Sequence, residues 1–321
     1  MSLRWVFDAL SPAGRRGRLS VLLFHRVRPH KDPLFPNEAD VAEFETRMRW
    51  IRDWFRVLPL EEALRRLRTG SLPARAAAIT FDDGYADNCT FALPVLRALG
   101  LHATFFIATG YLDGGRMWND TVIEAVRAAP GPALDLEDLQ LGRHPIATVA
   151  ERRAAIQHII RCLKYYALDQ RQHLADQIAA RVGAPLPDDL MLTTTQLRVL
   201  AGAGMGIGAH TVSHPILANI PDEVAWQEIT ESKRHLESLL KRPVNLFAYP
   251  NGKPERDYTA AHVRMVREAG FDAALCTAWG AAHYGCDIYQ IPRFTPWDRA
   301  PLAYALRLMR NLWRVEHVAT A

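Results

Sequence analysis

The sequence is poor in cysteine and contains no long hydrophobic run. The four cysteines, Cys89, Cys162, Cys276 and Cys286, form no CxxC pair, so neither a disulfide framework nor a cysteine-ligated zinc ribbon is expected. No apolar stretch approaches the roughly 18 residues that a membrane-spanning helix needs. The N-terminal segment also lacks an apolar core followed by a small-residue cleavage site. We therefore expect a cytoplasmic protein.

An excess of charge of one sign is also missing. The net charge of the 321 residues is only +4, which gives no reason to expect a nucleic-acid partner. Hydrophobic residues make up 49% of the chain, enough to build a sizeable core. These values fit one large globular domain, or one domain with a substantial insertion.

Short apolar segments alternate with amphipathic ones over most of the chain. This alternation is typical of a parallel sheet whose strands are joined by helices, here closed or partly closed into an α/β barrel. The predicted helices are 41–56, 87–99, 223–241 and 259–269, with a short helix marked by Leu60, Leu64 and Leu67. The predicted strands are 19–27, 76–83, 102–109, 206–210, 245–250, 272–277 and 288–294.

Two regions depart from this alternation. Residues 113–190 contain a long helical run and no strand pattern, so we expect a helical insertion within a single catalytic domain that spans 1–321. The second region, 300–321, predicts an amphipathic C-terminal helix. Leu302, Leu306, Met309 and Trp313 recur there at helical spacing, with arginines between them. Such a helix can lie on anionic lipid as a peripheral membrane contact, or it can pack on the domain.

The stretch "ITFDDGYADN" places two acids side by side at the end of a buried strand. Active sites of parallel α/β folds gather at the carboxyl ends of strands, where Asp82 and Asp83, His210 and the nearby His214 also fall. One aspartate and two histidines are a common ligand set for a catalytic divalent metal. Because successive strand residues point to opposite sides, Asp82 and Asp83 can have different roles. A metal ion is the positive partner that would make adjacent carboxylates tolerable.

"TFDDG" followed by "HTVSH" resembles the polysaccharide deacetylase family, also called the NodB-homology or carbohydrate esterase 4 family. The resemblance runs over residues 19–112 and 200–296 and leaves out the insertion. It implies a distorted, partly open β/α barrel that removes N- or O-acetyl groups from sugars with a metal-activated water. Carried over by position, it implies that Asp82 is the catalytic base and that Asp83, His210 and His214 bind the metal. Zinc is the default ion for these ligands, although cobalt, nickel or iron could occupy the same site.

Two further motifs are similar to a variant branch of the family. "FAYPNG" at 247–252 resembles the third motif, which lines the substrate groove. It suggests Tyr249 and Asn251 as substrate contacts, with the backbone N–H of Asn251 as oxyanion donor. The arginine that orients the base in most members is replaced by Ala248.

The last motif, "IYQIPRF", lacks the usual catalytic histidine, and Arg293 is a poor proton donor at neutral pH. His25, in "FHRV" on the first strand, is the best substitute as general acid. His283 is a weaker candidate. The competing interpretation of His25 is an ordinary histidine satisfied within a strand.

These observations predict a metal-dependent hydrolase that removes an acetyl group from an N-acetylated sugar. A lipid-linked or nucleotide-linked glycan precursor at the inner membrane face would fit a chain with basic ends. An amino-sugar deformylase, or another amide hydrolase of this fold, is the first alternative. A carbohydrate-binding pseudoenzyme is the second, because the motif histidine and arginine are missing, although the Asp82, Asp83, His210 and His214 set is complete.

Overall fold

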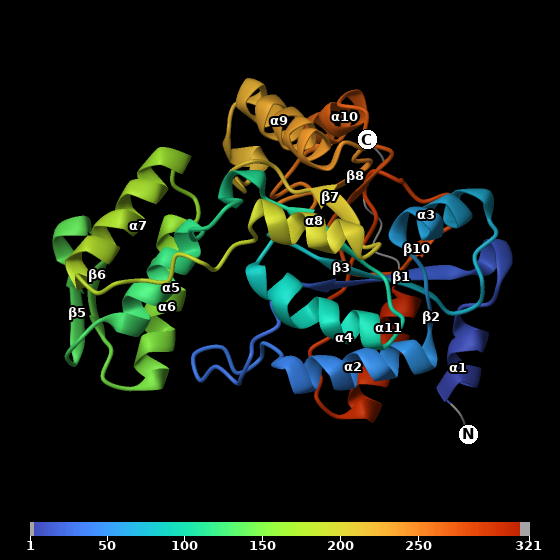
Figure 1. Ribbon diagram of the computed structural model, residues 1–321, viewed down its shortest axis with the longest axis horizontal. Coiled ribbons are helices and arrows are strands. Elements are labelled where there is room, and N and C mark those ends of the chain that lie inside the picture. Colours follow the sequence, from blue (N-terminus) through green and yellow to red (C-terminus); the bar gives the residue numbers. More distant parts are fainter. Residues whose placement is uncertain (1–2, 315–321) are drawn as a thin grey trace.

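A curled sheet of mostly parallel strands lies at the centre of the protein (Figure 1). The computed structural model describes residues 3–314. The strand order is β10-β1-β3-β4-β7-β8-β9, and β2 pairs with the start of β3. Only the β1–β10 pair is antiparallel among these neighbours. The strands are Arg18–Phe24 (β1), Arg56–Val57 (β2), Ala76–Phe81 (β3), Ala103–Ile107 (β4), Gly206–Ala209 (β7), Leu246–Ala248 (β8), Ala273–Leu275 (β9) and Ala282–His283 (β10).

The segment 288–294 connects the two ends of the curl. The Cys276 N–H donates to the carbonyl of Ile291 at 2.9 Å, and the Leu23 N–H donates to that of Phe294 at 2.9 Å. The segment forms isolated bridges to β9 and β1 instead of the regular strand expected at 288–294. The barrel is therefore partly open along this side, which confirms the predicted fold class.

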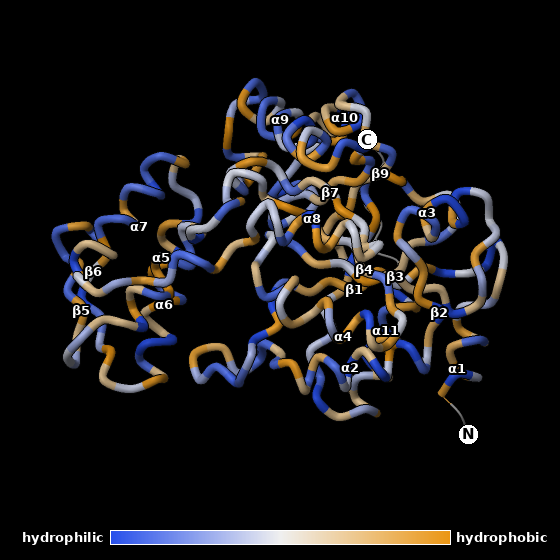
Figure 2. The backbone as a smooth tube through the Cα atoms, viewed as in Figure 1, coloured by the Kyte–Doolittle hydropathy of each residue, from blue (hydrophilic) through white to orange (hydrophobic). Residues whose placement is uncertain are grey.

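Strand side chains alternate between two layers. Leu19, Val21, Ala76 and Ala78 belong to a cluster with residues of β4, β8 and β9, so they line the inside of the curl. Helix α3 (Leu60–Thr69) closes this cluster with its leucines. The intervening strand residues face an outer cluster covered by helices. Figure 2 shows the hydrophobic segments concentrated in these central strands. Asp82 falls on the same alternation as Ala76 and Ala78, so its side chain also faces the inside of the curl.

Helices cover the outside of the sheet, with α2 and α11 on one side and α9 and α10 on the other (Figure 1). None of the helices in the described chain is both long enough and apolar enough to cross a bilayer. The predicted C-terminal helix is observed as far as Trp313, and residues 315–321 lie outside the described part. The helices are Leu3–Leu10 (α1), Val41–Trp54 (α2), Leu93–Ala98 (α4), Thr194–Gly202 (α8), Asp222–Leu240 (α9), Ala260–Glu268 (α10) and Pro301–Trp313 (α11).

Residues 113–190 build a lobe at the side of the barrel, drawn at the left of Figure 1. The lobe contains α5 (Trp118–Ala128), α6 (Val149–Leu163) and α7 (Leu168–Val182), which share a hydrophobic cluster of their own. It also contains an antiparallel hairpin of β5 (Ala133–Leu136) and β6 (Gly142–Pro145). The expectation that this region has no strand was therefore wrong. Leu134 and Leu136 are buried around the exposed Asp135, an alternation too short to recognise in the sequence.

Candidate metal centre and active site

A buried ion pair holds Asp82 at the inner end of β3. The two Nη atoms of Arg293 donate to the two carboxylate oxygens of Asp82 at 2.6 and 2.7 Å. Arg293 Nε donates to the carbonyl of Cys276 at 3.2 Å. Burial alone would raise the pKa of Asp82, but the charge of Arg293, with a smaller contribution from His210, keeps it below its usual value. Asp82 is therefore ionised at neutral pH.

Arg293 contacts Asp82 from the last motif, whereas the family's usual arginine in the third motif is replaced here by Ala248. From the sequence alone we assigned Arg293 no role beyond that of a poor proton donor, because the family places its arginine in the third motif. The guanidinium reaches the same carboxylate from the last motif, 211 residues away in the chain. The two side chains meet only because the segment 288–294 connects the two ends of the curled sheet.

Asp83, His210 and His214 converge at the same rim. The Nε2 atoms of His210 and His214 lie 3.5 and 3.3 Å from Oδ1 of Asp83. All three ligand atoms lie within 4.8 Å of one another. Two donors bound tetrahedrally to one zinc at about 2.1 Å would be about 3.4 Å apart, close to the two distances from the histidines to Asp83. The donor set therefore fits one divalent ion with an open coordination position.

The local backbone places these donors. Asp83, Thr211 and His214 all have positive φ (76°, 65° and 55°), so the chain turns sharply at each ligand loop. A residue other than glycine keeps a positive φ only where the surrounding contacts enforce it. His210 Nδ1 lies 2.7 Å from the carbonyl of Ala248, which turns Nε2 towards the carboxylates. Glu228 on α9 accepts the N–H groups of Val212 and Ser213 at 2.7 and 2.8 Å and anchors the 211–214 loop.

The electrostatics of the two histidines differ. Burial lowers the pKa of His214 to about 4, so its imidazole is neutral at pH 7. Burial acts in the same direction on His210, but the charges of Asp82 and Asp83 outweigh it and raise the pKa. The carboxyl pKa of Asp83 is lowered because both histidines counteract its desolvation. A neutral imidazole is the form that coordinates a metal, and His214 already has it.

His25 lies on the rim, whereas His283 does not. His25 follows β1 and is exposed, and its carbonyl accepts the Asn88 side-chain amide at 2.8 Å. β1 runs parallel to β3 with Phe24 opposite Phe81, so His25 and Asp82 follow at the same rim. His283 pairs with Arg18, the first residue of β1. The length of β1, about 20 Å at 3.3 Å per residue, separates it from the rim, so His283 is excluded as a proton donor here.

In the third motif, the side chain of Tyr249 is buried, whereas the backbone at Asn251 offers a donor that is free within the described chain. The Tyr249 ring is buried and stacks on Tyr258 at 3.8 Å, and its hydroxyl donates to the carbonyl of Tyr289 at 3.1 Å. Its N–H donates to Leu275, so neither group can reach a substrate, which corrects the expectation for Tyr249. Asn251 sits at a turn with φ 58°, and its N–H has no acceptor among residues 3–314.

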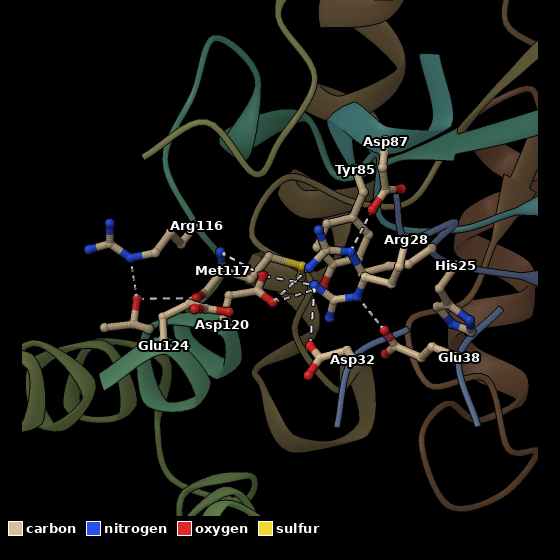
Figure 3. Close-up of polar contacts among 12 residues, drawn as sticks. His25, Arg28, Asp32, Glu38, Tyr85, Asp87, Arg116, Met117, Asp120 and Glu124 are labelled. Atoms are coloured by element: carbon tan, nitrogen blue, oxygen red, sulfur yellow. Dashed lines mark hydrogen bonds and ion pairs between the residues drawn. The ribbon is translucent and has the colours of Figure 1, made fainter. Parts of the chain in front are cut away.

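A polar cluster joins the barrel rim to the insertion (Figure 3). Arg26 Nε donates to Asp87 at 2.7 Å, and the Tyr85 hydroxyl donates to Asp120 at 3.2 Å. Burial raises the pKa of Asp120 to about 6, although the charge of Arg26 opposes the shift. Asp120 projects from α5, whereas Arg26 and Tyr85 come from the loops after β1 and β3. The cluster therefore fixes the lobe against the candidate metal centre.

Comparison with known proteins agrees with this fold and site. A family profile described as polysaccharide deacetylase matches residues 69–130 and 150–274, more than half of the chain. The protein therefore belongs to the polysaccharide deacetylase family, as the motifs predicted. The match extends into α5, α6 and α7, further than the motifs indicated, and omits residues 131–149, which contain the hairpin.

Several solved structures share the fold. The Streptococcus pyogenes deacetylase PplD in complex with acetate has a TM-score of 0.60 and 18% identity, covering 92% of this chain and 98% of that one. IcaB from Ammonifex degensii has a TM-score of 0.60 and 18% identity, covering 95% and 99%. In sequence, YxkH of Bacillus subtilis (strain 168) is 20% identical over 278 residues, which are 86% of this chain and 70% of that protein.

The ion pair makes a testable contribution to stability. We expect Arg293→Met to lower the free energy of unfolding by about 3–5 kcal/mol at pH 7, because it leaves a buried carboxylate without a partner. In the native protein the folded pKa of Asp82 is lowered, so its contribution is present above the unfolded pKa and is lost as pH falls through the folded value. In the variant the pKa of Asp82 in the folded state rises. The loss in free energy of unfolding relative to the wild type should therefore grow from pH 5 to pH 8. Urea unfolding with chelator present measures both the loss at pH 7 and its pH dependence.

The control for this prediction is the double variant Asp82→Asn, Arg293→Met, which has no charge at either position. It should recover part of the stability and lose the pH dependence of the deficit. An Arg293→Met protein as stable as the wild type at pH 7 would contradict the importance of the pair.

Proposed function

We propose that the protein is a metal-dependent deacetylase that hydrolyses the N-acetyl group of a sugar in a glycan. One observation carries the proposal: an ionised Asp82, fixed by Arg293, lies beside the Asp83, His210 and His214 donor set. Structures with this fold give further support. The Streptococcus pyogenes deacetylase was solved with acetate bound, and the Aggregatibacter actinomycetemcomitans protein with a TM-score of 0.55 is a de-N-acetylase.

Each residue has a task in amide hydrolysis. Asp83, His210 and His214 would hold a divalent ion, which would supply Lewis acidity towards the water and the acyl carbonyl. Asp82 accepts the proton of the attacking water, since its carboxylate is ionised and held in place. The Asn251 N–H stabilises the negative charge that develops on the carbonyl oxygen. His25, which is exposed at the rim, delivers a proton to the leaving amine.

Zinc is the proposed ion, because two imidazoles and one carboxylate with an open position are a common catalytic zinc site. We expect about one equivalent of divalent metal per chain, and loss of that metal in His210→Ala, His214→Ala. Elemental analysis measures the metal content. Acetate release from N-acetylated oligosaccharides should stop with chelator and return with added zinc.

His283→Ala is the matched control for the metal prediction, because His283 lies at the far end of β1. It should retain full metal and activity. Metal retained after loss of both rim histidines would refute the assignment. Formate released from formylated sugars, with no acetate released, would favour the deformylase alternative. A metal-loaded protein that releases neither would indicate the carbohydrate-binding alternative.

The proton donor can be separated from the base by kinetics. We expect His25→Ala to lower kcat by roughly 10²–10⁴-fold while the metal content stays unchanged. Because His25 is exposed, added imidazole should restore part of its activity. Asp82→Asn should lose hydrolysis without such rescue, since its site is buried. A His25→Ala enzyme with full metal and an unchanged kcat would assign the proton donor elsewhere.

We also propose that the face of α11 that is not packed on the domain contacts anionic membrane. Tyr304, Ala305, Leu308 and Leu312 pack inward, so the helix does dock on the domain. Leu302, Leu306 and Trp313 remain exposed, at 62%, 51% and 74%, and Arg310 and Arg314 are exposed among them. Apolar side chains flanked by cations are the pattern of an interfacial helix. The inner membrane face and a cytoplasmic location stay predictions.

Vesicle co-sedimentation tests this contact. We expect wild-type protein to bind vesicles containing phosphatidylglycerol and to bind pure phosphatidylcholine far more weakly. Leu302→Glu, Leu306→Glu should weaken binding about tenfold or more, because two apolar side chains no longer enter the interface. Val199→Glu, an equally exposed position on α8, is the control. Equal binding by both variants would contradict the proposal.

A further inference from the structure

Arg171 is a buried cation that has no hydrogen-bond or ion-pair partner in the described part of the chain. It lies in the first turn of α7 and is only 5% exposed. Its side chain makes no hydrogen bond or ion pair with any residue of the described range 3–314, and its Nε is fully buried. The guanidinium carbon lies 4.8 Å from the ring centre of Trp118. A guanidinium carries five N–H donors, and leaving buried donors unsatisfied costs free energy.

Trp118, which the guanidinium contacts, follows Met117 at the start of α5, and Met117 packs in one cluster with Tyr85 and Tyr111 near the loop that carries His214. Burial is the main cause of the low pKa of His214, and the charge of Arg171 adds to it. Arg171 also acts on Tyr111, whose hydroxyl donates to the carbonyl of Ser213 at 3.2 Å. The insertion therefore contributes a buried positive charge near the candidate metal centre.

Other arginines around the site are engaged. Arg293 binds Asp82, and Arg26 binds Asp87. Glu228 is the acid whose charge acts on Arg171, but it forms no ion pair with it and instead accepts two N–H groups and the Ser213 hydroxyl. Arg171 thus keeps its hydrogen-bonding capacity for an atom that is not part of this chain.

We propose that Arg171 forms an anion subsite beside the metal centre, which binds a carboxylate or phosphate group of the glycan substrate. This inference rests on the proposed deacetylase function and adds a substrate class to it. The planar guanidinium matches two oxygens of either group, and the contact with the Trp118 ring restricts its movement. Partial exclusion of water strengthens such a charged hydrogen bond. The substrate would thus carry an acidic group near the acetylated amine, as a uronic acid or as a sugar phosphate.

A purely structural role for Arg171 makes different predictions. In that case the side chain only packs α7 on α5 through Trp118, and its loss would affect every substrate alike, together with the melting temperature. A subsite instead makes the loss depend on the charge of the substrate. The discriminating measurement is therefore kcat/KM on substrates that differ only in one acidic group.

The test compares three N-acetylated oligosaccharides that are neutral, contain one uronate, or carry one phosphate ester. Arg171→Gln should lower kcat/KM for the preferred acidic substrate by about 10- to 100-fold, mainly through KM, and leave the neutral substrate within about twofold. The two acidic arms distinguish carboxylate from phosphate. Arg171→Lys should retain part of the preference. Arg181→Gln, in the last turn of the same helix and paired with the exposed Asp138, should behave as wild type.

Metal content and melting temperature are measured in parallel for every variant. Equal losses on all three substrates, or a wild type without preference for either acid, would overturn the subsite. If no substrate releases acetate, the proposed function fails first. Calorimetric titration with glucuronate and with inorganic phosphate then decides the subsite alone. Binding that Arg171→Gln abolishes supports it, and no binding to the wild type overturns it.

Discussion

The ion pair between Asp82 and Arg293 is the interaction on which the site depends. It allows a carboxylate to stay charged inside the barrel, next to a second carboxylate that belongs to the candidate metal centre. Without it, burial would favour the protonated form of Asp82, which cannot accept a proton. The pair also fixes where the irregular segment 288–294 runs, because the guanidinium must reach the end of β3. One contact thus keeps Asp82 ionised and links the segment 288–294 to the end of β3.

Much of this could be predicted from the sequence, because strand ends in a parallel sheet meet at one edge. "TFDDG" and "HTVSH" placed Asp83, His210 and His214 correctly at a common rim. The role of Arg293 was missed because it depends on barrel closure, which no local pattern encodes. Tyr249 was misassigned because a motif gives its position but not the direction of its side chain. The hairpin in the insertion was missed because four-residue strands carry too little periodicity.

The insertion contributes in a way that its sequence did not indicate. The sequences of its helices have an ordinary amphipathic pattern, and Arg171 is one of several arginines in them. Only the packed structure distinguishes it, since Arg181 of the same helix is exposed and paired whereas Arg171 is buried and unpaired. The Asp120–Tyr85 and Arg26–Asp87 contacts hold this lobe in place. The barrel thus carries the candidate metal ligands, and the lobe adds the buried arginine for which we propose a role in binding an acidic substrate group.

The segment that carries Arg293 also has a consequence for the order of folding. Asp82 and its partner are 211 residues apart, so the carboxylate emerges from the ribosome long before the guanidinium that neutralises it. Until then, closing the barrel around Asp82 would bury an unpaired charge, and loop-closure entropy adds to that cost. The Asp82 end of the barrel can therefore be completed only after the final motif has left the ribosome. A chain that stops short of that motif would lack the partner of this carboxylate.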